Sequence, residues 1–365
     1  MIFFVGGHHG IQAYLEMWGR PLAPRVAVLP YDDLWRMRRL PAGTYVFIDV
    51  DLLSPDEAER AALAWTSLAE AGMRPLNHPL RSLRRYELLR TLKERGLNSF
   101  DVYLATEARL PGRFPVFVRE ANDHAGPITD LLPTADALRA SLDGLVAKGK
   151  SREGKVIIEF CDTADANGLY RKYSAQIVGD RVVPIHIAFS RSWMTKGTRV
   201  NDQDLLQEEL DYVRGNPHEQ ALREIFALAH IDWGRIDYGV RDGVVQTWEI
   251  NTNPYLIATE VGHPSREPAC AYAAERLNEA LAAVDSRAPS RPGTTNPLRV
   301  RWVRARQRRV LHAGLTLVGL TRHERRVIDA LWATRDRLFR LLRGIRAAPS
   351  LLRRRCRPSA VRPRL

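Results

Sequence analysis

The stretch from Arg235 to Pro254, RIDYGVRDGVVQTWEINTNP, restricts the fold more than any other part of the sequence. Two strand-like runs flank Arg241-Asp242-Gly243, which predicts a hairpin with a three-residue loop whose glycine is left-handed. In that register Asp237 and Glu249 share one face as diagonal neighbours, about 7–8 Å apart. A two-residue turn would instead place the two carboxylates on opposite faces of the sheet.

Asn251 continues the face of the two acids, while Trp248 and Ile250 are expected on the opposite, apolar face. Asp237, Glu249 and Asn251 together form an oxygen-only ligand set, which is typical of Mg²⁺ that also binds substrate phosphates. A solvated hairpin with one acidic face is the alternative. The Asn-Thr-Asn-Pro continuation suits a strand poorly and therefore favours a functional site.

Strand and helix signals alternate in the first 75 residues. Short apolar runs at Ile2–Val5, Val26–Leu29 and Tyr45–Val50 predict buried strands. A helix is expected between Ser54, which opens a capping box, and Gly72, which ends it. This alternation predicts a small parallel α/β domain over residues 1–75.

Residues 76–285 have a different pattern. Arg74–Pro79 is expected to be an irregular connection, followed by a helix from Leu80 to about Arg95. Further helices are expected at Ala135–Ala147 and from about Arg266 to Val284. The remaining strand-like runs are Phe114–Arg119, Lys155–Phe160, Ser174–Val178, Val182–Phe189, Arg235–Val240 and Val244–Asn251. Their close spacing indicates antiparallel pairing, unlike that of the first domain.

The net charge of +13 is unevenly distributed along the 365 residues. Residues 286–365 hold 22 Arg, no Lys and three acidic residues, a net charge of +19, so the preceding body is mildly acidic at −6. Residues 286–297 are rich in Pro, Ser, Gly and Thr and predict a linker. Residues 298–365 predict an Arg-rich helical tail. An anionic membrane surface, a nucleic acid or an acidic partner would each suit this tail, as would packing on the body.

Cys161, Cys270 and Cys356 lie far apart, and this excludes a disulfide scaffold and a thiolate zinc site. No run approaches the roughly 18 apolar residues of a membrane span. The opening MIFFVGGHHG lacks the basic segment of a signal peptide. We therefore expect a cytoplasmic protein without an integral membrane span, and the basic tail leaves peripheral attachment to a membrane open.

The body resembles the ATP-grasp superfamily, whose members carry an acid on one strand and Glu-x-Asn on the next, twelve residues on. Asp237, Glu249 and Asn251 fit that spacing. LNHPLRSLRRYELLRTLKERGLNSFDVY looks like the connection, helix and turn that open these folds. FPVFVRE looks like the strand with a phosphate-binding Lys, and VIIEFC like the hinge strand whose backbone meets adenine. The resemblance covers residues 75–260 and is to glutathione-synthetase-like and ribosomal-protein glutamate ligases.

This resemblance implies an α/β protein with an ATP-grasp domain over residues 76–285, in which two α+β lobes, divided near residue 160, grip ATP. The preceding parallel domain would be the usual pre-ATP-grasp domain. Asp237, Glu249 and Asn251 would bind Mg²⁺, with Mn²⁺ as an alternative, and bridge the ATP phosphates. The residues expected to contact ATP are Arg119, Glu159, Phe160, Cys161, Arg171 and Lys172.

Residues 159–161 would meet adenine mainly through backbone groups. Arg171 and Lys172 would contact phosphate or carboxylate, unless they form a charged strand entry exposed to water.

The sequence departs from the family pattern at the phosphates. Arg119 stands where relatives usually have Lys, and its guanidinium can clamp phosphate bidentately. A second family Lys, on the helix after Asn77, is absent, so Arg85 or Arg90 would have to replace it. The loop EANDHAGPIT has one Gly where relatives have a Gly-rich lid. His124 in this loop would contact phosphate or substrate, or stay solvated.

Two other segments invite a functional interpretation. Gly6–Gly10, with two adjacent histidines, is better explained by a structural or substrate-facing loop at a strand end than by a metal site. The segment containing Arg191, Trp193, Lys196 and Arg199 is basic and aromatic. It would hold an anionic substrate, with Arg191 as the catalytic candidate, or cover the sheet edge with charge.

The resemblance implies an ATP- and Mg²⁺-dependent ligase that joins a carboxylate to an amine or thiol through an acylphosphate. Arg119 would offset charge on the transferred phosphoryl group. The expected substrates are small-molecule or peptide carboxylates and amines. The alternative is a nucleotide-binding ATP-grasp protein without ligase activity, whose basic tail binds an anionic membrane, nucleic acid or partner. Arg119 and the Gly-poor loop motivate this alternative.

Overall fold

The computed structural model describes residues 1–7, 9–37, 40–123, 126–195, 202–257 and 264–285. The predicted linker and Arg-rich tail lie outside these residues, as do His124, Lys196 and Arg199. Within the described part of the chain, no helix combines the length and the apolar character needed to cross a membrane.

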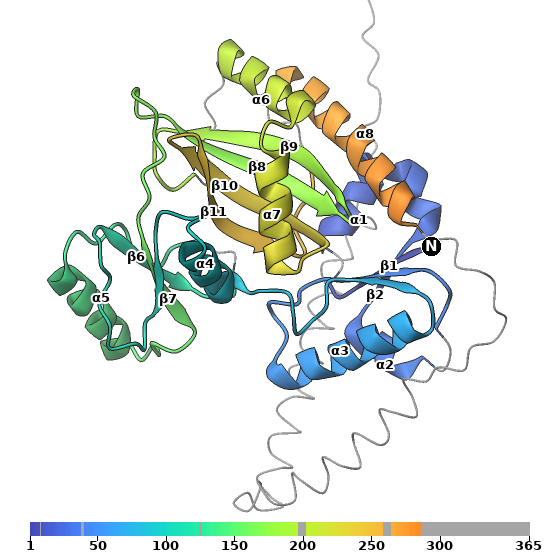
Figure 1. Cartoon of the computed structure of the whole chain (residues 1–365), viewed down its shortest axis with the longest axis horizontal. Helices are drawn as coiled ribbons and strands as arrows, with labels where there is room; N and C mark the ends of the chain where they lie inside the picture. The colour runs from blue at the N-terminus through green and yellow to red at the C-terminus, as the bar shows by residue number, and fades with distance from the viewer. Residues whose placement is uncertain (8, 38–39, 124–125, 196–201, 258–263, 286–365) are drawn as a thin grey trace, which may run out of the picture. The chain divides into compact units, whose positions relative to one another are not determined.

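A parallel sheet forms the N-terminal part of the chain (Figure 1). Its strands, in spatial order, are β2 (Val26–Leu29), β1 (Ile2–Val5), β3 (Thr44–Phe47) and β4 (Arg74–Leu76). The helical segments between them are α1 (His9–Met17), η1 (Arg20–Arg25), α2 (Tyr31–Arg36) and α3 (Pro55–Glu70). The predicted parallel α/β arrangement is confirmed. The prediction of an irregular Arg74–Pro79 was wrong at its start, because edge strand β4 tolerates a proline that lacks an N–H group.

Helix α3 begins as its sequence predicts. The Ser54 hydroxyl accepts a hydrogen bond from the Glu57 backbone N–H, and the Glu57 carboxylate accepts one from the Ser54 N–H at 2.9 Å. Gly72 follows the helix with a φ of +76°, a conformation that glycine adopts without strain. These two signals fix both ends of α3 over the sheet.

A small antiparallel lobe follows the parallel domain. Its strands, in spatial order, are β5 (Val102–Leu104), β7 (Lys155–Glu159) and β6 (Val116–Glu120), and its helices are α4 (Arg85–Glu94) and α5 (Ala135–Ala147). Helix α5 has its predicted bounds. Helix α4 starts five residues later than predicted. The N–H groups of Arg81 and Ser82 instead turn back to the His78 carbonyl, and Leu83 donates to the Ala229 carbonyl.

A larger antiparallel sheet carries the remaining strands. In spatial order they are β11 (Val244–Asn251), β10 (Trp233–Arg241), β8 (Tyr170–Val178) and β9 (Arg181–Ser190). Helices α6 (Gln203–Gly215), α7 (Glu219–Ala229) and α8 (Glu267–Val284), the last preceded by η2 (Pro264–Arg266), pack against this sheet (Figure 1). The sequence analysis predicted α8 but neither α6 nor α7.

The β10–β11 hairpin has a shorter loop than predicted. Arg241 pairs with Val244, so the loop contains only Asp242 and Gly243, at φ values of +52° and +77°. Positive φ at both positions is the geometry of a type I′ turn, for which Asp-Gly is a preferred sequence. The prediction of a three-residue loop was therefore wrong.

A β-bulge nevertheless keeps the two acids on one face. Tyr238 pairs with Thr247, but Asp237 pairs with Glu249, so Trp248 is the extra residue in β11. Asp237 and Glu249 lie directly opposite each other, which is closer than the predicted diagonal arrangement. The bulge thus restores the face that a two-residue turn alone would have reversed.

Asn77 joins the parallel domain to the large sheet. It is fully buried with a φ of +58°. Its side-chain amide donates to the carbonyls of Phe47 (3.0 Å) and Trp233 (2.7 Å). Its side-chain oxygen accepts from the N–H groups of Asp232 and Trp233, both at 2.9 Å. One side chain therefore satisfies four buried backbone groups of two sheets.

Replacing Asn77 with Ala should lower the free energy of unfolding by on the order of 3 kcal/mol, because four buried polar groups lose their partner. Chemical denaturation measures this loss. Asn77→Asp keeps the accepting oxygen and should fall between wild type and Asn77→Ala. Asn167→Ala, at an exposed turn, is the matched control. Equal stability of the Asn77→Ala and Asn167→Ala proteins would contradict the assigned role.

Candidate functional site

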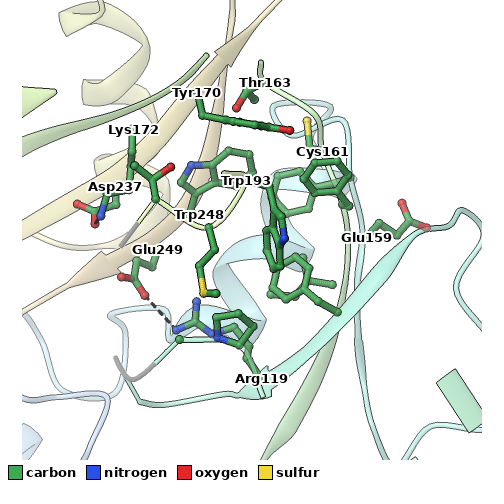
Figure 2. Close-up of a pocket in the computed structure, with 18 of the residues that line it drawn as sticks. Arg119, Glu159, Cys161, Thr163, Tyr170, Lys172, Trp193, Asp237, Trp248 and Glu249 are labelled. Atoms are coloured by element: carbon green, nitrogen blue, oxygen red, sulfur yellow. Dashed lines mark hydrogen bonds and ion pairs between the residues drawn. The ribbon is translucent and has the colours of Figure 1, made fainter. Parts of the chain in front are cut away.

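A pocket lies between the small lobe and the large sheet (Figure 2). Strands β6 and β7 contribute one wall, and β8, β10 and β11 contribute the other, together with residues 193–195 that follow β9. The pocket has an aromatic region and a charged region. Eight of the ten residues predicted to be catalytic, to contact ATP or to bind metal line it; Asn251 and Arg191 do not.

Asp237 occupies the charged region and is almost fully buried. Its carboxylate accepts hydrogen bonds from Lys172 Nζ (2.9 Å), Ser174 Oγ (2.8 Å) and Arg235 Nε (3.1 Å). Burial by itself would raise the pKa of this carboxyl, but the charges of Arg235 and Lys172 together hold the pKa below its ordinary value. Asp237 is therefore a carboxylate at neutral pH.

Glu249 stands opposite Asp237 and is held by two arginines. The Arg85 guanidinium contacts Glu249 Oε2, and Arg119 Nη2 lies 3.5 Å from the same oxygen (Figure 2). The side chains of Arg85 and Arg119 are only 5% and 12% exposed. Both also donate to the Asp123 carbonyl, at 2.8 and 3.1 Å. Helix α4 and strand β6 thus position two guanidinium groups over one carboxylate.

The two arginines retain unused hydrogen-bonding capacity. The Nε atoms of Arg85 and Arg119 are buried and have no hydrogen-bond partner among the described residues. Burial, and then the charge of Arg85, lower the pKa of Arg119 to about 10, so Arg119 stays charged at neutral pH. The sequence analysis left Arg85 and Arg90 as alternative replacements for the second family Lys. Arg90 pairs with Asp101 at 3.0 Å, away from the carboxylate pair, whereas Arg85 reaches it.

The residues present suit a Mg²⁺ ion that is shared with phosphate. Asp237 and Glu249 are directly opposite each other and offer only oxygen donors. No cluster of three or more His, Cys, Asp or Glu suited to a metal occurs in the described ranges. A cation here would take its remaining ligands from water and phosphate, which is how Mg²⁺ is usually bound. Four basic side chains face the two carboxylates, so these side chains together carry a net positive charge that attracts a polyanion.

Asn251 was predicted as the third metal ligand. It pairs with Arg235 in the hairpin, and its side-chain oxygen accepts from the Asn253 N–H at 2.8 Å. Asn253 in turn donates to Asp49 of the parallel domain. The structure therefore places Asn251 at the start of the turn that connects the hairpin to that domain, and its metal-binding role stays a prediction.

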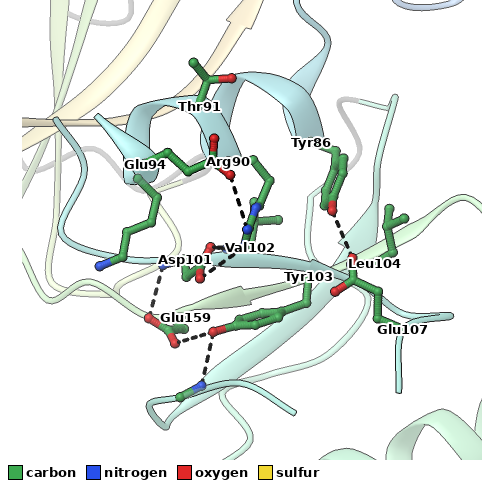
Figure 3. A network of polar contacts seen from close by, with 12 residues as sticks. Tyr86, Arg90, Thr91, Glu94, Asp101, Val102, Tyr103, Leu104, Glu107 and Glu159 are labelled. Atoms are coloured by element: carbon green, nitrogen blue, oxygen red, sulfur yellow. Dashed lines mark hydrogen bonds and ion pairs between the residues drawn. The ribbon is translucent and has the colours of Figure 1, made fainter. Parts of the chain in front are cut away.

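The Glu159 carboxylate belongs to a buried network rather than to the pocket surface (Figure 3). It accepts hydrogen bonds from Asp101 N, Tyr103 Oη, Arg113 N and Arg113 Nε, each at 3.1 Å. These bonds hold the end of β7 against the segments before β5 and β6. The Glu159 N–H donates to the Asp101 carbonyl at 3.0 Å, so the contact of this position with adenine stays a prediction.

Aromatic rings form the other region of the pocket (Figure 2). The Trp193 ring lies against those of Phe117 and Phe160, with centroids 5.1 and 5.9 Å apart. Trp248, predicted to face the apolar side of the hairpin, instead lines the pocket because it is the bulged residue. Cys161 lines the same region and is buried. Flat apolar walls of this kind suit a planar ring.

Arg171 and Lys172 have different partners. Arg171 binds Glu208 (2.6 and 3.1 Å) and Asp165 (2.7 Å), and the hydrogen bond to Glu208 is the main reason that its pKa is raised. Lys172 faces Asp237. Of the two, Lys172 is therefore the one directed at the carboxylate pair, and Arg171 is held at the rim by acids.

Arg191, the second catalytic candidate, is exposed and donates to the Asn167 carbonyl at 3.1 Å. Sequence reasoning missed Arg235, which lies two residues before Asp237 on the same face of β10. The period of two along a strand was the signal that could have found it. Arg235 also donates to the Tyr255 carbonyl at 2.5 Å, which fixes its guanidinium over the site.

The order of a parallel α/β domain, a small antiparallel lobe and a large antiparallel sheet, with the pocket between the last two, is the order that the ATP-grasp resemblance implied. The predicted fold class, a parallel α/β domain followed by two α+β lobes, is therefore confirmed for the described residues, whereas the helical tail lies outside them.

No protein-family model matches the chain, and no curated protein matches its sequence. Solved structures do match. D-alanine–D-alanine ligase from Bacillus anthracis is 14% identical over 78% of this chain and 95% of that chain, with a TM-score of 0.45. D-cycloserine synthetase DcsG is 18% identical over 77% and 99%, with a TM-score of 0.45. A RimK domain ATP-grasp protein from Sphaerobacter thermophilus DSM 20745 is 13% identical over 75% and 98%, with a TM-score of 0.40.

Because the two carboxylates are already paired with basic side chains, we expect metal binding to depend on nucleotide. Mn²⁺ alone should bind poorly, and the non-hydrolysable ATP analogue AMP-PNP should tighten Mn²⁺ binding at least about tenfold, within the usual range of coupling between sites. Electron paramagnetic resonance of free Mn²⁺ measures both affinities. Arg85→Gln removes one competitor for Glu249 and should strengthen binding of Mn²⁺ alone, whereas Arg90→Gln on the same helix should not. Equal Mn²⁺ affinity with and without AMP-PNP would refute the coupling.

Proposed function

We propose that the chain is an ATP- and Mg²⁺-dependent ligase that joins a carboxylate to an amine through an acylphosphate. One observation carries the proposal. Asp237 and Glu249 face each other at one end of a pocket, each paired with basic side chains, while the other end is lined by aromatic rings. A nucleotide matches both ends, because its base is flat and apolar and its phosphates are charged.

The chain's own residues suggest how the nucleotide is held. Phe160, Trp193 and Trp248 exclude water around the base. Arg85 and Arg119 exchange Glu249 for phosphate oxygens, and this exchange frees the carboxylate. Bound Mg²⁺, held through the two carboxylates, supplies further charge neutralisation for the phosphates.

Two displacement steps would follow. A substrate carboxylate oxygen attacks the terminal phosphorus of ATP, and ADP leaves. Arg235 and Lys172 lie on the face where negative charge develops, so they stabilise the transferred phosphoryl group. An amine nitrogen then attacks the acyl carbon, the carbon–oxygen bond to phosphate breaks, and inorganic phosphate leaves.

The alternative of a binding protein without ligase activity was motivated by Arg119 and the Gly-poor loop. The geometry favours turnover instead, because Arg119 lies within 3.5 Å of Glu249 and Arg85 accompanies it. In this proposal the two guanidinium groups take the role of the two family lysines that the sequence lacks. The anionic partner of the Arg-rich tail stays a prediction, supported by the net charge of +19 over residues 286–365.

ADP release should be detectable when the full-length chain receives Mg·ATP, hydroxylamine and a suitable carboxylic acid. A panel of L- and D-amino acids, dipeptides and dicarboxylic acids supplies the candidates. Hydroxylamine traps an acylphosphate as a hydroxamate, which gives a second readout.

Glu249→Gln should lower this turnover by at least about 100-fold, since even second-shell changes at metal sites cost 10–100-fold. Glu94→Gln, an exposed site on α4, is the control and should leave turnover unchanged. Binding of AMP-PNP without hydroxamate or ADP from any panel member would support the non-ligase alternative.

A further inference from the structure

A histidine shares the face of the large sheet that carries the two carboxylates. Asp237 pairs with Glu249 on one side and with Ser174 on the other, and Ser174 pairs with His186. Directly paired residues point to the same face, so these four side chains form one row across β11, β10, β8 and β9. Strands lie about 4.8 Å apart, which puts His186 about 10 Å from Asp237.

Charged groups from every neighbouring element face His186. Lys172 comes from β8, Arg235 and Asp237 from β10, and Arg266 from the segment before α8. Arg266 is itself paired with Glu209 of α6. The cations therefore outnumber the carboxylates around the imidazole, and a second positive charge at this position is unfavourable.

The imidazole of His186 is partly exposed and has no hydrogen-bond partner among the described residues. Burial, and then the charge of Arg235, lower its pKa to about 3. The ring is therefore neutral at neutral pH and offers a free nitrogen lone pair. Among the residues that the structure describes, no group uses this lone pair, which separates His186 from His78 and His218.

Two of the other described histidines, His218 and His78, have structural partners. His218 Nδ1 lies 2.9 Å from the Tyr238 hydroxyl, on the opposite face of the same sheet. His78 packs its ring against Trp65, at 4.8 Å between centroids. His186 differs from them in two ways. It lies in the same row across the sheet as Asp237 and Glu249, and its imidazole has a nitrogen that accepts no hydrogen bond from the described residues.

We propose that His186 receives the amine nucleophile of the ligase reaction, an inference that rests on the proposed function. The amine approaches from the β9 side, and its N–H donates a hydrogen bond to the imidazole. As the new carbon–nitrogen bond forms and the carbon–oxygen bond to phosphate breaks, the amine proton passes to the imidazole and phosphate leaves. His186 then releases the proton to water.

The surrounding cations make proton transfer to His186 more favourable after the acylphosphate has formed than before. Before the acylphosphate is made, burial first, then the charge of Arg235 and to a smaller extent that of Lys172, keep the pKa of the imidazole low. Once acylphosphate oxygens pair with these two side chains, their part of this effect falls. His186 would then accept a proton more readily than before the electrophile is present.

Comparing two nucleophiles, hydroxylamine and an amino-acid amine, distinguishes a proton-accepting role of His186 from a structural role. Hydroxylamine is largely unprotonated at neutral pH and attacks acylphosphates without a base, whereas an amino-acid amine is protonated and must lose protons. The preceding screen selects the carboxylic acid, and repeating it with amino acids in place of hydroxylamine selects the amine. With these substrates, His186→Gln should lower kcat/KM for the amine by at least about 100-fold, the usual worth of acid–base catalysis. Hydroxamate formation should change little.

Further variants keep the test decisive. His186→Ala should regain amine turnover when imidazole is added to the buffer, and this rescue does not require His186→Gln to fold well. His218→Gln, on the opposite face, should treat both nucleophiles alike. Retained amine turnover in His186→Gln, an equal loss of both reactions in folded protein, or no imidazole rescue would each overturn the inference. A wild-type chain that yields no hydroxamate would overturn the ligase proposal itself.

Discussion

One extra residue in strand β11 decides whether this chain has a carboxylate pair. The Asp242-Gly243 turn sets the pairing of the hairpin, and continuation of that register would put Glu249 on the face that carries the core residue Ile236. A carboxylate buried there without a partner would cost several kcal/mol. The bulge at Trp248 moves Glu249 to the polar face, where Glu249 forms an ion pair with Arg85. The pocket, its charge and its aromatic wall all depend on this local irregularity.

Much of the fold could be predicted because sequence signals within a few residues determine where its helices and strands begin and end. The capping box at Ser54 and the apolar alternation of β11 act within a few residues, and both elements were found at or near their observed ends. The shared face of Asp237 and Glu249 was predicted correctly, but from a loop length that was wrong. A three-residue loop and a two-residue loop with a bulge both put Asp237 and Glu249 on one face, and periodicity alone does not distinguish them.

Other features depend on contacts between distant segments. Helix α4 starts at Arg85 because Leu83 is hydrogen-bonded to Ala229, 146 positions further along the chain. Arg85, at the first position of α4, meets Glu249, whereas Arg90 meets Asp101. Helical periodicity puts these two arginines on different sides of the helix, but the local sequence does not say which side faces the carboxylate. The same limit applies to His186, whose neighbours come from three separate segments.

The pairing of both carboxylates with basic side chains has a consequence for the energetics of ligand entry. Asp237 and Glu249 already have counter-charges within the protein. If the chain binds a nucleotide and its cation as proposed, these ligands would exchange partners with groups that are already paired. The attraction would then come from the excess of four basic side chains over two carboxylates, so affinity for nucleotide should fall as ionic strength rises. In the proposed ligase, the existing ion pairs would hold both carboxylates in place before nucleotide and metal bind.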